Sequence, residues 1–124
     1  MRLKILFVVL AVGLVWSPLV ADEVTDWNHI MLLAARAAVP PTPAPYMTRN
    51  GAILQAAVFD AFNGIERRYT PIHVTPAAPR GASRRAAIVQ AAHDALVDIY
   101  PAQTGTFDAD LDASLAAIAA KSEG

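Results

Sequence analysis

ILQAAVFDAFNGIERRY, residues 53–69, is the most apolar stretch with helical periodicity after the N-terminal segment of the chain. Leu54, Val58 and Ile65 share one face at 100° per residue, with small alanines between them, as a packed α-helix requires. One carboxylate, Asp60, stands in the middle of this apolar pattern. We expect the rest of the chain to pack around this helix, which should begin between residues 48 and 51.

The same periodicity predicts further helices, and no stretch alternates apolar and polar residues as a strand would. These helices are expected over residues 24–38, 84–100 and 107–120. A side chain suited to capping the first turn stands at each start: Thr25 or Asp26, Ser83 and Thr106. The fold class predicted is therefore all-α, with about four helices.

Two connectors separate these helices. VPPTPAP, residues 39–45, is too rich in proline to be helical and should form a stiff, extended link. YTPIHVTPAAPRGA, residues 69–82, is a long loop with arginines in it and beside it, namely Arg67, Arg68, Arg80, Arg84 and Arg85. An arginine cluster can hold an oxyanion, but a solvated or docking surface is the favoured interpretation here.

Composition limits the range of functions. The chain has 124 residues, room for one domain at most, and much of its hydrophobic content is alanine, which buries little area. A formal net charge of -1 argues against a nucleic-acid partner. Because cysteine is absent, disulfides, thiolate catalysis and cysteine-ligated metal centres are excluded.

The N-terminal segment predicts export. Arg2 and Lys4 precede an apolar run over residues 5–16, and Ala21 precedes two acidic residues. This order is typical of a secretory signal peptide over residues 1–21, cleaved after Ala21, with retention as a membrane anchor as the alternative. Residues 22–124 should then lie in the periplasm or outside the cell, with membrane contact only through the leader.

Asp60 is the sharpest polar candidate. A carboxylate in an apolar helix has to be paired or hydrogen-bonded, so we expect Arg36 or an arginine of the loop as its partner. Asn63 is adjacent to Asp60 on the helix surface. A structural role is favoured over a catalytic acid or base, because no second carboxylate stands beside Asp60 in a motif.

The histidines do not predict a metal site. His29, His73 and His93 lie on different expected elements, and no pair has the spacing of metal ligands on one helix. We expect His29 and His93 at the edge of a core, each with a hydrogen bond. The expected buried polar residues are therefore Asp60, Asn63, Arg36 and His93, with no catalytic, cofactor-binding or metal-binding residue assigned.

Several short motifs, in order, carry a family resemblance. They are VTDWN at 24–28, AARA at 34–37, AAVFDAFNGI at 56–65, YTP at 69–71, SRRAA at 83–87, HDAL at 93–96 and YP at 100–101. This series resembles the N-terminal region of bacterial vanadium-dependent haloperoxidase-like proteins, of the type 2 phosphatidic-acid phosphatase superfamily. The resemblance covers essentially all of residues 22–124. One departure is Gln55, where the family pattern has a histidine.

The resemblance implies an oxyanion pocket that binds vanadate or phosphate through a lysine, two arginines and two histidines. The family motifs for those residues are absent: no Arg-Pro or Ser-Gly-His occurs, Lys121 is the only lysine after Lys4, and Gln90 stands where Ser83-Arg84 would require a histidine. No catalytic residue is carried over. We expect no cofactor in this chain, with vanadate bound only by the full-length enzymes of the family.

The expected function is therefore the non-catalytic, helical N-terminal portion of an exported haloperoxidase-like or acid-phosphatase-like enzyme. Two helices are apolar nearly all round, which predicts an incomplete bundle that packs on a missing C-terminal catalytic half or self-associates. The alternative is a complete small secreted helical protein that binds a partner. A metal-dependent hydrolase that uses Asp60 and the histidines is the least favoured interpretation.

Overall fold

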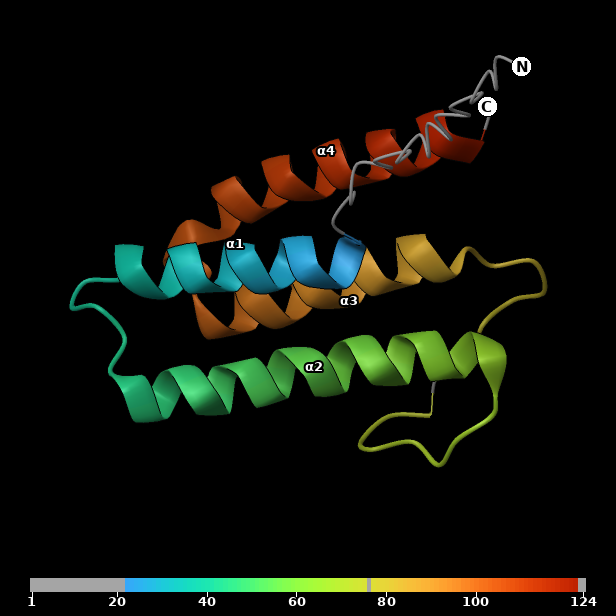
Figure 1. The fold of residues 1–124 in the computed structure, drawn as a ribbon, viewed down its shortest axis with the longest axis horizontal. Helices are drawn as coiled ribbons and strands as arrows, with labels where there is room; N and C mark the ends of the chain where they lie inside the picture. The colour runs from blue at the N-terminus through green and yellow to red at the C-terminus, as the bar shows by residue number, and fades with distance from the viewer. Residues whose placement is uncertain (1–21, 76, 123–124) are drawn as a thin grey trace, which may run out of the picture.

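The computed structural model describes residues 22–75 and 77–122, and over these ranges the secondary structure is entirely helical (Figure 1). The elements are α1 Glu23–Ala37, α2 Ala44–Glu66, α3 Arg84–Ile99, the 3₁₀ turn η1 Pro101–Gln103 and α4 Thr104–Ser122. The prediction of an all-α fold with four helices is confirmed. The expected signal peptide and its cleavage site lie outside the described residues. Whether the bundle packs on a further half stays a prediction.

None of the helices in the described ranges is both long enough and apolar enough to cross a membrane.

The helix starts show where local capping was predicted correctly. Ser83 caps α3 as expected, and its hydroxyl accepts a hydrogen bond from the Ala86 amide at 3.2 Å. The cap predicted for α1 is wrong: Asp22 caps it and accepts from the Thr25 amide at 2.9 Å. The start predicted for α4 is also wrong. That helix begins at Thr104, whose hydroxyl donates to the Pro101 carbonyl at 2.8 Å.

The start of α2 departs most from the prediction. The helix begins at Ala44, within the proline-rich connector, and it includes Pro45 in its first turn. The first-turn amides of a helix have no intrahelical acceptor, so a proline there loses nothing. At the other end, Arg67 adopts the left-handed conformation with φ 55°, and its amide donates to the Asn63 carbonyl. This turn sends the chain into the long loop.

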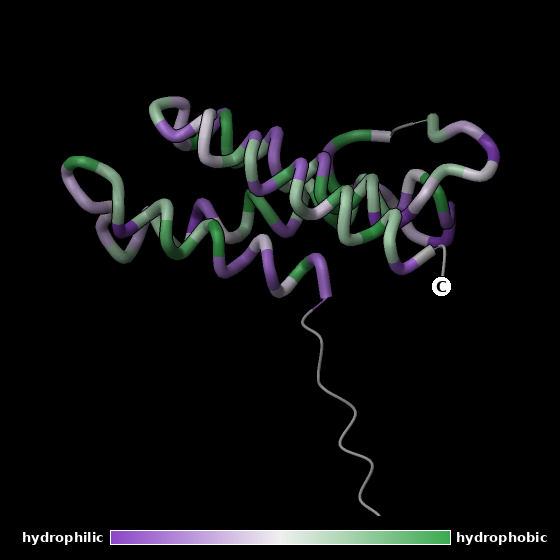
Figure 2. Tube along the Cα trace, turned by 90° about the horizontal axis from the view of Figure 1, so that it is seen from above, coloured by the Kyte–Doolittle hydropathy of each residue, from purple (hydrophilic) through white to green (hydrophobic). Residues whose placement is uncertain are grey.

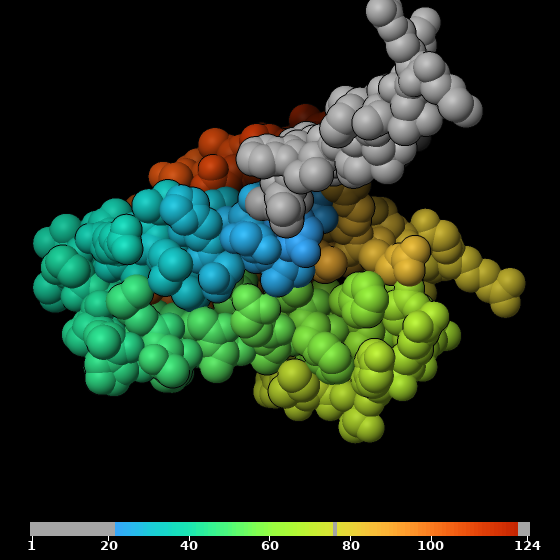
Figure 3. Space-filling view, viewed as in Figure 1, coloured from blue at the N-terminus to red at the C-terminus, as the bar shows by residue number. Residues whose placement is uncertain are grey.

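The centre of the bundle is α3, not α2. It contacts each of the other three α-helices, whereas α2 packs on α3 and, less extensively, on α1. Its Val89, Ala92 and Leu96 have no solvent exposure. Figure 3 shows the side of the molecule on which α1 lies between α2 and α4. The expectation that the rest packs around residues 53–69 is therefore wrong, because α3 is the helix on which the other three pack.

Hydrophilic and hydrophobic residues interleave along the helices (Figure 2). The buried apolar side chains come from all four helices and the adjoining Tyr100: Trp27, Met31, Ala34, Ala35, Leu54, Val58, Val89, Ala92, Leu96, Tyr100 and Phe107. Polar groups at the edge of this core form hydrogen bonds. The Trp27 indole donates to the Ser114 hydroxyl at 3.2 Å, and the Tyr100 hydroxyl accepts from the Asn50 amide at 3.0 Å.

A central position for α3 predicts that Leu96→Ala destabilises the fold strongly. Its side chain has no solvent exposure, so truncation leaves a cavity and should cost roughly 2–5 kcal/mol of unfolding free energy. Urea denaturation followed by circular dichroism measures this cost. Leu33→Ala is the matched control, since Leu33 is 47% exposed. Equal losses in the two variants would contradict the packing described.

Candidate functional site

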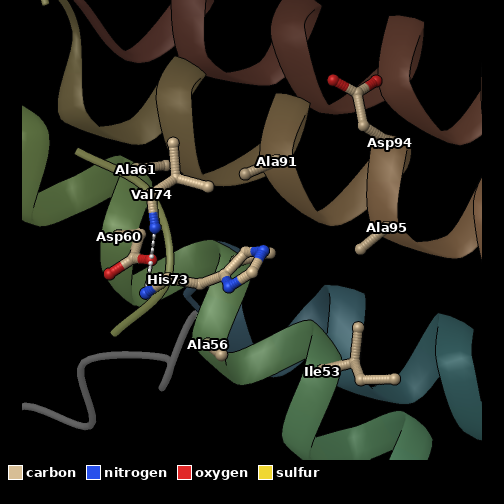
Figure 4. A pocket seen from close by; sticks show the side chains of 10 residues that line it. Ile53, Ala56, Asp60, Ala61, His73, Val74, Ala91, Asp94 and Ala95 are labelled. Atoms are coloured by element: carbon tan, nitrogen blue, oxygen red, sulfur yellow. Dashed lines mark hydrogen bonds between the residues drawn. The ribbon is translucent and has the colours of Figure 1, made fainter. Parts of the chain in front are cut away.

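The most elaborate polar arrangement in the described residues is built around Asp60. Its carboxylate accepts hydrogen bonds from three consecutive backbone amides, that of Ile72 at 2.7 Å and those of His73 and Val74 at 2.8 Å. Figure 4 draws the bonds from His73 and Val74. The residue is only 4% exposed. Asp60 is thus buried, but its partner is the backbone of the loop and not an arginine, so the predicted ion pair is wrong.

Arg36 lies elsewhere. It stands in the last turn of α1 and is exposed, so it is neither buried nor a partner of Asp60. A cation at this end of a helix interacts favourably with the backbone carbonyls that lack intrahelical partners. Arg36 lies on the side of α1 that faces water, so its side chain stays outside the core.

Asn63, one turn after Asp60, holds the first part of the same loop. Its side-chain amide donates to the Tyr69 carbonyl at 2.7 Å, and its side-chain oxygen accepts from the Arg68 and Tyr69 amides at 3.2 and 2.9 Å. It is 3% exposed. Asp60 and Asn63 together therefore fix the chain from residue 68 to residue 74 against the surface of α2.

These hydrogen bonds determine the ionisation of Asp60. The amides of Val74, Ile72 and His73 lower the pKa of the carboxyl below its usual 3.8, against the opposing effect of burial. The group is therefore ionised at neutral pH, and both of its oxygens already accept hydrogen bonds. A carboxylate in this state neither donates a proton nor accepts one readily, so the geometry favours the structural role over general acid–base catalysis.

The arginine cluster is largely internally paired. Glu66 binds Arg84 at 2.6 Å and Arg68 at 3.3 Å, while Arg85 pairs with Glu23 of α1. The Arg67 guanidinium donates to the Ala78 carbonyl at 3.4 Å. The donors are thus shared with glutamates and the backbone. The residues described here do not fit a vanadate or phosphate pocket, which requires several cations converging on one point.

His93 lies at the edge of the core, between α3 and α4. Its ring nitrogens are 2.9 Å from the Asp94 carboxylate and 2.7 Å from that of Asp108, and its ring meets the Trp27 ring edge-on at 6.3 Å. Burial alone lowers the pKa of His93. Its hydrogen bonds to the two carboxylates outweigh that effect and raise the pKa above 6.5. Protonated His93 therefore links the two helices.

The remaining histidines form no ligand set. His29 is exposed on α1, and His73 is exposed on the loop. Within residues 22–75 and 77–122, no group of three or more histidine, aspartate or glutamate side chains lies close enough together to hold a metal ion.

An apolar hollow of about 650 Å³ opens between α2 and α3, beside the loop that Asp60 holds (Figure 4). Its floor is built of small side chains from both helices, and His73 and Val74 form its lip. The lining residues are Ile53, Ala56, Ala57, Asp60, Ala61, His73, Val74, Ala91, Asp94 and Ala95. Charged groups line it only at Asp60 and Asp94, which suits an apolar occupant with a neutral or cationic edge.

Comparison with known proteins gives no relative: no family model, no curated protein and no solved structure matches the chain.

The sequence indicated that Asp60 and Asn63 are buried, but it did not indicate the hollow. In the sequence, the alanines of α2 and α3 are ordinary small residues on helical faces. They line a hollow only because these two helices pack side by side. The hydrophobic residues Ile72 and Val74 of the loop were the available signal. They stay 63% and 53% exposed while their backbone is fixed.

Because Asp60 binds the loop through its charge, we predict that Asp60→Asn frees residues 69–75. The neutral amide replaces one carboxylate oxygen by a donor, which faces backbone donors. Limited proteolysis should cut within this loop much faster, whereas Asp112→Asn, an exposed carboxylate on α4, should leave the cleavage rate unchanged. Cleavage at the wild-type rate in both variants would contradict the role of Asp60.

The same variant should change the pH dependence of stability. The folded pKa of Asp60 is lowered, so its contribution is complete above pH 3.8 and is lost as pH falls through the folded value. The difference in melting temperature between wild type and Asp60→Asn should therefore shrink on acidification below pH 3.8. A difference that is constant across this range would show that the charge is not used.

His93 should act in the opposite direction. Its folded pKa is raised, so the stabilisation that it supplies is complete below pH 6.5 and is lost as pH rises through the folded value. Thermal melts of wild type and His93→Gln should converge as the solution becomes alkaline. Melting curves that stay equally far apart from acid to alkaline pH would exclude a protonated link between α3 and α4.

Proposed function

We propose that this chain is the N-terminal, non-catalytic helical portion of an exported vanadium-dependent haloperoxidase-like or acid-phosphatase-like enzyme. The observation that carries this proposal is the use of Asp60 and Asn63. These residues are the polar members of the motif AAVFDAFNGI, and they bind the backbone that includes the next motif, YTP. Hydrogen bonds between the two segments thus give a physical reason why these two motifs occur together.

The other motifs also meet in the fold. Trp27 of VTDWN is a buried core residue and packs against His93 of HDAL. Tyr100 of the Tyr-Pro pair receives a hydrogen bond from Asn50 of α2. Residues that carry the resemblance are therefore those on which packing depends, which supports a shared helical framework and not a shared reaction centre.

Catalysis is assigned to another part of such an enzyme. The four arginines that flank the loop are engaged by Glu66, Glu23 and a backbone carbonyl, and the Asp60 carboxylate accepts from three backbone amides. What the chain supplies is a folded support with an apolar face. Family chemistry, either halide oxidation by peroxide at bound vanadate or phosphomonoester hydrolysis, would require a lysine, arginines and histidines in the family motifs, and this sequence contains none of those motifs.

A second candidate, a complete small secreted binding module, is favoured by one observation. Among the described residues, every buried side-chain nitrogen or oxygen has a hydrogen-bond partner. Such satisfaction is what a domain that folds independently requires. The two candidates differ in whether a catalytic partner exists, and both assign no chemistry to the chain itself.

The proposal predicts that the chain alone shows neither vanadate-dependent bromide oxidation nor phosphomonoester hydrolysis above the buffer control. Vanadate titration followed by ⁵¹V nuclear magnetic resonance should also show only the free anion. The coding sequence after residue 124 provides the positive arm: if it encodes the three oxyanion motifs, both polypeptides expressed together should gain one of the two activities. Turnover by the chain alone that disappears in Asp60→Asn would refute the proposal.

A further inference from the structure

Ile53 lies where three hollows on the surface of α2 and α3 meet. It lines the hollow of about 650 Å³ beside the loop, a second hollow of about 730 Å³ across α2, and a third of about 420 Å³ near Tyr100. We call the surface formed by Arg49, Ile53, Ala56, Asp94 and Ala95 the α2–α3 face. Ile53 is half-buried and stands like a knob between these hollows, of which the first has a floor of alanines.

Opposite charges stand on the two sides of this knob. Arg49 lines the second hollow and, together with Asp98, the third, whereas Asp94 lines only the first, so Ile53 lies between Arg49 and Asp94. Arg49 takes part in none of the ion pairs of the described residues. Asp94 is 65% exposed, and its neighbours Gln90 and His93 both bind the same oxygen, which leaves the other available.

We propose that the α2–α3 face binds a second copy of this chain in a twofold-symmetric dimer. A twofold axis beside Ile53 brings Arg49 of one copy against Asp94 of the other, and the same operation forms the reciprocal pair. Ile53 of each copy then enters the alanine-floored hollow of its partner. Because α2 and α3 run antiparallel (Figure 1), two such pairs of helices give the up-and-down arrangement of a four-helix interface.

The face is also prepared for binding before a partner arrives. The lip of the first hollow, at His73 and Val74, is held by the Asp60 carboxylate. Little loop entropy is therefore lost on association. Val74 exposes an apolar side chain from a backbone that is already immobilised. An apolar centre with a charged rim is the composition of a specific protein interface. This inference goes beyond the proposed function, since the self-association expected from the sequence was not assigned to any surface or geometry.

Charge exchange tests the dimer on the chain as the producing cell processes it. Sedimentation velocity over a concentration series should show a monomer–dimer equilibrium for wild type. Arg49→Glu and Asp94→Arg each place two pairs of like charges in the symmetric interface, so each should raise the dissociation constant about tenfold or more. The double variant Arg49→Glu/Asp94→Arg should recover the wild-type value. Arg80→Glu changes the same charge on the exposed loop and should have no effect.

Folding of the variants is checked by circular dichroism. If Asp94→Arg loses helix, Arg49→Glu and Ala56→Arg, which alter the rim and the floor, carry the test without it. A wild-type chain that stays monomeric at every concentration would overturn the proposal. So would a dimer that Arg49→Glu weakens no more than Arg80→Glu does, or a monomer whose face instead binds the catalytic portion of an enzyme or an apolar dye.

Discussion

The hydrogen bonds from three consecutive backbone amides to the Asp60 carboxylate hold the loop against α2, and the surface beside that loop depends on them. A buried negative charge has to be compensated, and a loop that leaves a helix has amides without partners. Here the loop amides donate to the buried carboxylate, so both groups are satisfied. Asn63 repeats the arrangement one turn later, so that the second half of α2 serves as a template for residues 68–74. Ile72 and Val74 are thereby held at the surface.

Behind this surface, the bundle is organised by α3. Its Val89, Ala92 and Leu96 are fully buried where α3 packs against α1, α2 and α4. On the outer side of α3, Ala91 and Ala95 do not fill the space beside α2, and a hollow remains. Alanine on the outer side of α3 thus explains the open face, whereas larger side chains fill the core.

Periodicity and capping rules predicted the helices well, because these are local properties. Ser83 is such a case: a short hydroxyl before an apolar periodic run has few other roles. The start of α2 was missed because a rule against proline inside helices was applied to a first turn, where it does not hold. The central position of α3 was not predictable from its own residues, since it depends on how four amphipathic helices choose partners.

The site was predicted in part for a similar reason. Burial of Asp60 follows from its apolar neighbours on the helix, whereas its partner is backbone, which has no sequence signature. Arginines were the obvious candidates, but Glu66 and Glu23 engage three of those beside the loop. Arg36 remained on the outer side of α1. Side-chain identity therefore indicated that Asp60 needed a partner and did not indicate which one.

The central claim, that Asp60 is a structural anchor, is tested most directly by amide hydrogen exchange resolved by nuclear magnetic resonance. The amides of Ile72, His73 and Val74 each donate to the carboxylate, so they should be protected although their side chains are exposed. Exchange at the rate of an unstructured peptide at all three positions would contradict this account. It would show that the Asp60 carboxylate does not hold the loop.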